Sequence, residues 1–196
     1  MKTPLNAIAL AGIVTTSLFV SGCATRFKPS ASHNPPPAEI LSSFTAFEIQ
    51  AVSIAPAYAN NGANQKALAK IQSNMSASVD PVLASWNQAG AGQGKDARTL
   101  VIDPLVTDIK FIGGFARFMV GPLAGSSAVI MRATLTDKET GQVVAAPEFY
   151  VAANAHGGAM TMGTTDNRML SAIVENFKEY LLKNYAMLVG GPTGAY

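Results

Sequence analysis

Apolar and β-branched residues are concentrated in four short stretches of the chain, a pattern that predicts β-strands. Residues 44–56 form the first stretch and end at a proline, and residues 99–112 form the second. Residues 127–136 and 142–153 are joined by the sequence DKETG at 137–141, whose final glycine is typical of a tight turn. The last two stretches therefore predict a β-hairpin.

Apolar side chains recur at helical spacing in two further stretches. The positions are Leu68, Ile71, Met75, Val79, Val82, Leu83 and Trp86 in the first, and Leu170, Ile173, Val174, Phe177, Leu181, Tyr185 and Leu188 in the second. Pro81 lies inside the first stretch and removes a backbone donor, so we expect a kink or a division into two helices. The second stretch predicts a helix over residues 166–189 that Gly190 ends.

The elements follow in the order β-α-β-β-β-α, which predicts an α+β fold. We expect a mostly antiparallel sheet of about four strands with two long helices packed on it. A single domain is expected over residues 39–189, followed by a flexible C-terminal tail at 190–196. Pro104 favours a bulge or an edge position because proline cannot donate to a neighbouring strand. Gly141 is expected at a positive φ, which a short turn requires.

The first 22 residues have the layout of a secretory signal peptide. Lys2 supplies a basic start, and residues 7–20 form an apolar run that is short for a membrane-spanning helix. The run leads into Val20, Ser21, Gly22 and Cys23, and Cys23 is the only cysteine of the chain. These four residues resemble the lipobox of bacterial lipoproteins. The resemblance implies a signal peptide at 1–22, a peptidase recognition site at Val20 to Gly22, and acylation of Cys23.

The lipobox resemblance also implies a location for the protein. Several acyl chains on Cys23 would hold the chain in a lipid bilayer, since each buried methylene contributes about 0.8 kcal/mol. Ala24 follows the cysteine, where an aspartate would resemble a signal for retention in the inner membrane. We therefore expect a lipid anchor in the outer membrane and a domain that faces the periplasm.

Residues 23–38 contain three successive prolines with serine and alanine and predict an extended tether. Fifteen such residues could span up to about 50 Å. His33 lies in this tether and is expected to be solvated. The whole chain carries a net charge of +2 with 13% charged residues, so it has no basic field for nucleic acid.

A second resemblance covers the sequence ARFMVGPLAGSSAVIMRATLTDKETGQVV at 116–144, and extends loosely over 44–185. This stretch is similar to a widespread family of bacterial lipoproteins whose α/β domain has no assigned function. The matching positions are Arg117, Gly121, Gly125, Asp137, Thr140 and Gly141. Pro122 departs from the family pattern, in which a glycine or an aromatic residue is expected. The resemblance implies an envelope lipoprotein and supplies no catalytic residues.

Residue types that serve catalysis are sparse, so we expect no enzymatic activity and no cofactor. The glycine-rich stretch at 121–127 lacks the lysine of a phosphate-binding loop, and the chain has only two histidines. Asp103 and Asp108 are five residues apart on a predicted strand. They should point to opposite faces and make a poor acid/base pair. An uncharacterised enzyme stays open as an alternative.

A second alternative comes from the sequence HGGAMTMGTTDNRM at residues 156–169. One imidazole and two thioethers, from His156, Met160 and Met162, suit Cu(I). The competing interpretation is a glycine-rich loop whose methionines fill gaps over the core. The main functional hypothesis is a non-enzymatic interaction module in envelope assembly or maintenance, which binds an envelope protein whose identity the sequence does not give.

Overall fold

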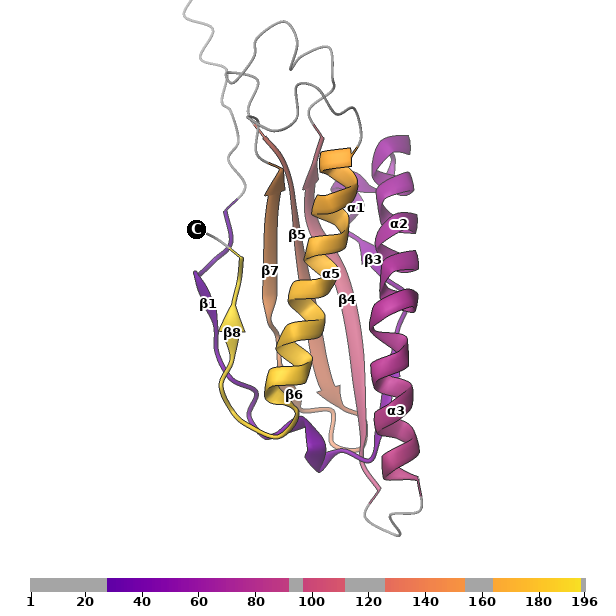
Figure 1. Cartoon of the computed structure of the whole chain (residues 1–196), viewed down its shortest axis with the longest axis vertical. Helices are drawn as coiled ribbons and strands as arrows, with labels where there is room; N and C mark the ends of the chain where they lie inside the picture. Colours follow the sequence, from indigo (N-terminus) through magenta and orange to yellow (C-terminus); the bar gives the residue numbers. More distant parts are fainter. Residues whose placement is uncertain (1–27, 92–96, 112–125, 154–163, 195–196) are drawn as a thin grey trace, which may run out of the picture.

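The computed structural model describes residues 28–91, 97–111, 126–153 and 164–194 (Figure 1). Its strands are β1 (His33–Asn34), β2 (Ala46–Ile49), β3 (Ser53–Ile54), β4 (Thr99–Lys110), β5 (Ser127–Asp137), β6 (Val143–Ala145), β7 (Glu148–Ala153) and β8 (Gly191–Pro192). Its helices are the 3-10 helix η1 (Leu41–Ser43) and the α-helices α1 (Pro56–Ala59), α2 (Gly62–Ser78), α3 (Asp80–Gly90) and α5 (Thr164–Tyr185).

The main sheet is mixed and has six strands, in the order β2-β4-β5-β6, with β3 also on β4 and β7 also on β5. The α+β class is confirmed, but the expected mostly antiparallel sheet of about four strands is wrong. β2 and β3 run parallel to β4, whereas β5 pairs antiparallel with β4, β6 and β7. The parallel pairs arise because the chain crosses over through α1, α2 and α3 before it returns as β4.

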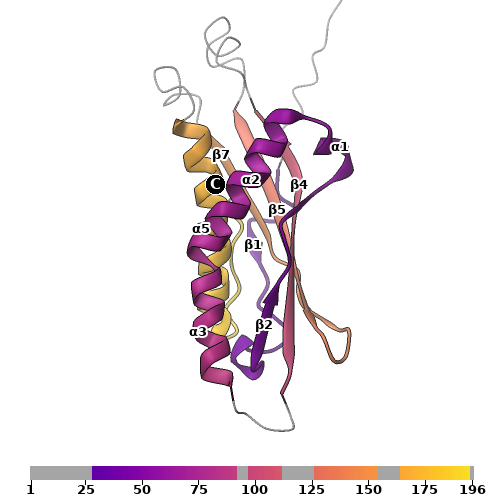
Figure 2. The ribbon, with the colours of Figure 1, turned by 90° about the vertical axis from the view of Figure 1, so that its right-hand side faces the viewer.

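The helices α2, α3 and α5 cover one face of this sheet, as Figure 2 shows. α2 ends and α3 begins around Val79, which is fully buried, and Pro81 lies in the first turn of α3. Proline is tolerated there because the first helical N–H groups have no partner within the helix. The predicted division of the first helix at Pro81 is confirmed.

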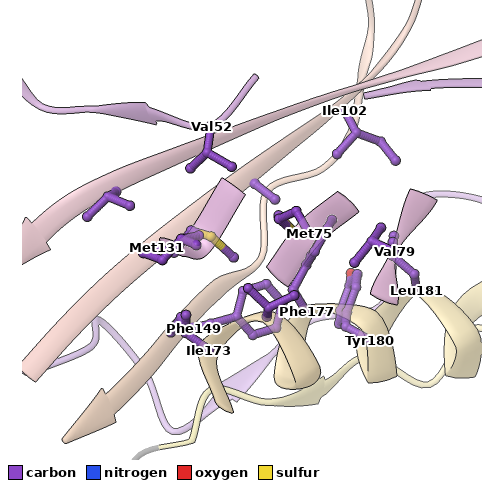
Figure 3. Close-up of a cluster of buried hydrophobic side chains, with 14 of the residues drawn as sticks. Val52, Met75, Val79, Ile102, Met131, Phe149, Ile173, Phe177, Tyr180 and Leu181 are labelled. Atoms are coloured by element: carbon purple, nitrogen blue, oxygen red, sulfur yellow. The ribbon is translucent and has the colours of Figure 1, made fainter. Parts of the chain in front are cut away.

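The core lies between these helices and the sheet (Figure 3). β5 contributes Val129, Met131, Ala133 and Leu135, and α5 contributes Leu170, Ile173, Val174, Phe177 and Leu181, all buried as their spacing predicts. The ring of Phe149 meets the rings of Phe177 and Tyr180 edge-on, at centroid distances of 5.8 and 5.9 Å.

Irregularities in β4 follow from its neighbours. Pro104 lies where β2 has ended and β3 has not begun, since β2 pairs as far as Ile102 and β3 starts opposite Leu105. The nitrogen of Pro104 carries no hydrogen, and it lies opposite the gap between β2 and β3. No backbone hydrogen bond to a neighbouring strand is needed there. The bulge lies further along, between Val106 and Asp108, rather than at Pro104.

The turn between β5 and β6 has the predicted conformation. Gly141 has a φ of 72°, which confirms the expectation of a positive value. Oδ1 of Asp137 accepts hydrogen bonds from the backbone N–H groups of Glu139 and Thr140, at 2.9 and 3.0 Å. The turn is thus closed by its first aspartate and its last glycine.

Two segments expected to lie outside the domain are part of it. β1, from the predicted tether at 23–38, pairs antiparallel with β8, from the predicted tail at 190–196. The tether and tail predictions are wrong for the described residues of both segments. The last helix also ends earlier than predicted, at Tyr185. The buried side chain of Asn184 accepts hydrogen bonds from the N–H groups of Val189 and Gly190, which turns the chain towards β8.

Candidate functional site

Residues 30–38, which we call the N-terminal clamp, are bound at the edge of β7. The amide of Asn34 makes two hydrogen bonds of 2.8 Å to the backbone N–H and C=O of Glu148. The backbone N–H and the hydroxyl of Ser30 both donate to Oε1 of Glu148, at 2.6 and 2.7 Å. Burial alone would raise the pKa of Glu148, but hydrogen bonds from Ser30 and Arg132 lower it.

α5 and the chain after it hold the other side of the clamp. The hydroxyl of Tyr180 donates to the carbonyl of Pro35 at 3.0 Å, and burial raises the pKa of Tyr180 to about 12. Gly190 has a φ of 67°, and a Cβ there would lie 2.3 Å from the carbonyl oxygen of Asn34. Such close approach requires glycine. The clamp therefore pairs with the segment that follows α5 and reaches the edge of β7 through Ser30 and Asn34.

The clamp limits the length of chain between Cys23 and the first contact with the domain. Ser30 is the first clamp residue with a fixed partner, and it follows Cys23 by seven residues. Seven extended residues span at most about 25 Å, half the reach expected for the predicted tether. If Cys23 is acylated, the domain is held within this distance of the bilayer surface.

A charged cluster fastens the far end of the clamp to the sheet. The guanidinium of Arg98 binds both carboxylate oxygens of Glu39 at 2.7 and 2.8 Å, and its Nε donates to Asp137 at 3.0 Å. The guanidinium carbon also lies 4.4 Å from the centre of the Phe44 ring. Hydrogen bonds from Arg98 lower the pKa of Glu39 and hold the pKa of the buried Asp137 at about 2.

A side-chain amide binds backbone groups of one residue at each of two edges of the main sheet. At the β7 edge, Asn34 satisfies Glu148 as described above. At the β2 edge, Asn87 accepts from the N–H of Phe47 at 2.7 Å and donates to its C=O at 3.0 Å. Edge strands with free backbone groups invite pairing with another chain, and these two amides occupy such groups on each edge.

The segment after α5 exposes large apolar side chains. Met187, Leu188 and Val189 are 59, 49 and 46% exposed, and we call these three residues the apolar segment. Leu182, near the end of α5, is 49% exposed. Single exposed apolar residues are common, but three in succession form a surface on which another protein can bury area.

The two aspartates of β4 lie on the same face of the sheet, so their predicted placement on opposite faces is wrong. Asp103 pairs with Thr134 and Asp108 pairs with Ile130, which are an even number of residues apart on β5. The bulge in β4 causes this change, since one extra residue reverses the alternation. The aspartates lie about 13 Å apart along the strand, beyond the about 5–9.5 Å of paired carboxylates in glycoside hydrolases.

Most residues that the sequence singled out lie outside the described part of the chain. These are Val20, Ser21, Gly22 and Cys23, then Arg117, Gly121 and Gly125, and the proposed copper ligands His156, Met160 and Met162. Asp137, Thr140 and Gly141 are described, and the structure brings them together in the turn after β5. In the described ranges, no three His, Cys, Asp or Glu side chains gather as a metal ion would require. No helix within those ranges is long and apolar enough to cross a membrane.

Sequence reasoning missed the residues that form the clamp and its far end, namely Asn34, Glu39, Arg98, Glu148 and Tyr180. The pairs Glu39–Arg98, Asn34–Glu148 and Pro35–Tyr180 join residues that are 59 to 145 positions apart in the chain. Only the two polar residues His33 and Asn34, directly before the proline run, could have signalled that this segment makes specific contacts.

Comparisons with known proteins give little further guidance. No protein-family model matches the chain, and no curated protein matches it. A PelC dodecamer from Paraburkholderia phytofirmans is similar with a TM-score of 0.44 and 13% identity, over 81% of this chain and 100% of that chain. A single-residue variant of that dodecamer has a TM-score of 0.38 and 13% identity, over 72% of this chain and 91% of that chain. Likeness at this level carries no conclusion about function.

Proposed function

We propose that this protein is a lipoprotein of the bacterial envelope whose domain serves as a non-enzymatic interaction module in envelope assembly or maintenance. Its anchor would be Cys23, acylated in the outer membrane, with the domain on the periplasmic side. The observation that carries the proposal is the sequence of Val20 to Cys23, followed within seven residues by the N-terminal clamp. A short attachment of this kind raises the local concentration of the domain near other anchored proteins.

The apolar segment supports a role in protein binding. Met187, Leu188 and Val189 are exposed, whereas the amides of Asn34 and Asn87 occupy the edges of the sheet. A partner anchored in the same envelope could bury the apolar segment without any change in the sheet. Such burial would contribute about 25 cal/mol for each Å² of apolar surface removed from water.

The anchor is tested by replacing Cys23 with serine. We expect Cys23→Ser to leave uncleaved precursor, to lose metabolic labelling with palmitate, and to leave the carbonate-washed outer-membrane fraction. Ala24→Ser places the same side chain one residue later, keeps the thiol, and should behave as wild type. Equal partitioning of wild type and Cys23→Ser would contradict the anchor.

The interaction is tested by crosslinking in cells with a photoreactive residue at Met187. We expect discrete adducts with an envelope protein, identified by mass spectrometry, which Leu188→Glu abolishes at unchanged protein level. The matched control carries the same photoreactive residue at Asp103, which is exposed on the face of the sheet away from the helices. The same adducts from both positions, or none from Met187, would contradict the apolar segment as the docking surface.

A further inference from the structure

Asn184 lies in the last turn of α5, where the chain leaves the helix towards β8 (Figure 1), and its side-chain amide is fully buried. Its Nδ2 donates to the carbonyls of Tyr180 at 2.8 Å and Gly190 at 3.0 Å. Its Oδ1 accepts from the N–H groups of Val189 at 3.1 Å and Gly190 at 2.9 Å. These four bonds use the whole donor and acceptor capacity of the amide and close residues 185–190 into a short loop.

The N-terminal clamp holds the end of the same loop from the other side. Gly190 has a φ of 67°, and it lies so close to the carbonyl of Asn34 that a Cβ has no room. Directly after Gly190, β8 pairs with β1 of the clamp. Tyr180 binds both sides, because its hydroxyl donates to the carbonyl of Pro35 and its own carbonyl accepts from Asn184. The loop therefore ends between Asn184 and the clamp.

The apolar segment belongs to this loop, so its backbone is held while its side chains face water. Met187, Leu188 and Val189 are exposed, although the N–H of Val189 is bound by Asn184. A loop whose backbone is fixed before binding loses less conformational freedom when a partner covers it. The arrangement therefore suits a partner whose surface has one complementary shape.

The side chains beside the apolar segment are apolar, aromatic or paired. Leu182 is exposed and lies three residues before Tyr185, on the same side of α5. Trp86 stacks on the ring of Tyr185 at a centroid distance of 4.2 Å. The two charged residues in the last two turns of α5, Lys183 and Glu179, form an ion pair at 2.6 Å. This part of α5 therefore offers no unpaired charge.

A pocket in a protein fits these features better than a lipid bilayer does. A bilayer is fluid and accommodates a flexible chain as well as a fixed one, so the four bonds of Asn184 would bring little advantage there. Anionic headgroups are attracted by basic side chains, and Lys183 is already bound to Glu179. A preformed apolar pocket, by contrast, is complementary to one conformation of the segment.

We infer that Asn184, supported by the N-terminal clamp, presets the apolar segment for insertion into an apolar pocket of a protein partner. This inference rests on the proposed function, in which the apolar segment is the docking surface. Asn184 has no exposed surface and acts as a positioning residue, through the backbone of Val189 and Gly190. Because the clamp packs against Gly190, release of the clamp should weaken docking as well.

The test measures the backbone and the docking in the same variants of the full chain. Amide hydrogen exchange at Val189 and Gly190 reports the backbone, and the yield of protein adducts from a photoreactive residue at Met187 in cells reports docking. Asn184→Ala removes the acceptor of both amides, so we expect their exchange to speed up by about tenfold or more. The yield of Met187 adducts should fall several-fold at an unchanged level of protein.

Two control variants separate positioning from a general loss of stability. Asn167→Ala makes the same change at an exposed position near the start of α5 and should alter neither measurement. Asn87→Ala opens the β2 edge and should also alter neither, even though it destabilises the domain. Asn34→Ala is expected to release the clamp and should change both measurements in the direction of Asn184→Ala. It keeps the test decisive if Asn184→Ala does not accumulate in cells.

The apolar character of the pocket is tested at Leu188. Leu188→Asn brings an amide into the pocket without a partner and should abolish the Met187 adducts. Ala77→Asn adds the same side chain at an exposed position of α2 and should retain them. Equal adduct yields from both variants, or adducts with phospholipid and not with protein, would overturn the protein pocket.

The outcomes also separate this inference from the proposed function. Absence of Met187 adducts in the wild type would refute the docking surface, and the inference with it. Adducts that persist in Asn184→Ala despite faster exchange would overturn the inference alone. Fast exchange at Val189 and Gly190 in the wild type, or an equal loss of adducts in Asn87→Ala, would do the same.

Discussion

The N-terminal clamp makes a sharp prediction for the substitution Asn34→Ala. The side chain of Asn34 is 4% exposed, and its two hydrogen bonds of 2.8 Å satisfy the backbone N–H and C=O of Glu148. Each bond contributes about 1 kcal/mol, and each backbone group left without a partner costs about 1–3 kcal/mol. We expect Asn34→Ala to lower the free energy of unfolding by about 2–4 kcal/mol, because water can reach part of the opened edge. For a chain of this size, the Tm should fall by about 5–15 °C.

The assay compares Asn34→Ala with Asn87→Ala, which removes the same pair of bonds from Phe47 at the opposite edge. Trp86 is the only tryptophan and stacks on Tyr185 with ring centres 4.2 Å apart, so its emission should follow unfolding. Both variants should be destabilised. Only Asn34→Ala should speed amide exchange in residues 30–38 and at Thr193, since only this variant releases the clamp.

Two outcomes would contradict the role of Asn34 in holding the clamp. An unchanged Tm for Asn34→Ala, with amide exchange at 30–38 as slow as in the wild type, would show that the clamp does not depend on Asn34. Fast exchange at 30–38 in the wild type would show that the segment is a tether, as its proline content predicts. Either result would also mean that more than seven residues separate Cys23 from the first fixed contact with the domain.

Two further predictions concern stability. Gly190→Ala should destabilise the domain by more than about 2 kcal/mol, because it adds strain at a positive φ to a clash with the carbonyl of Asn34, whereas Gly62→Ala has open space and should be neutral or stabilising. Equal Tm values for the two variants would contradict the close packing at Gly190. Hydrogen bonds from Arg98 lower the pKa of Asp137 to about 2, so the ionised carboxylate stabilises the folded state. This contribution to the free energy of unfolding is complete above about pH 4 and is lost as the pH falls through 2. In Asp137→Asn, the urea concentration at the unfolding midpoint should therefore fall less steeply between pH 4 and pH 2 than in the wild type. The same slope in both proteins would contradict the ion pair between Asp137 and Arg98.

The helices and the central strands could be predicted from sequence because their apolar positions are regular. The stripe from Leu170 to Leu181 on α5 and the alternation from Val129 to Leu135 on β5 each follow from local periodicity. The turn that ends at Gly141 could be predicted as well, because Asp137 and Gly141 are residue types typical of tight turns. Parallel pairing of β2 with β4 follows from the connection between them, and the expectation of a mostly antiparallel sheet overlooked this rule.

The clamp could not be predicted because its contacts are not local. Strand β1 has two residues and is fixed by β8, by Glu148 and by Tyr180, all more than 110 residues away. Composition alone favours a tether there, since prolines and serines do not form a core. The face on which Asp108 lies depended on a single bulged residue, which no periodic pattern marks.

The mass of the N-terminal peptide of the mature protein decides whether Cys23 is a lipid anchor. Protein extracted from its native envelope should begin at Cys23 and carry a diacylglyceryl group on the thiol and a third acyl chain on the amino group. A mature chain that begins at another residue, or that begins at Cys23 without lipid, would refute the anchor.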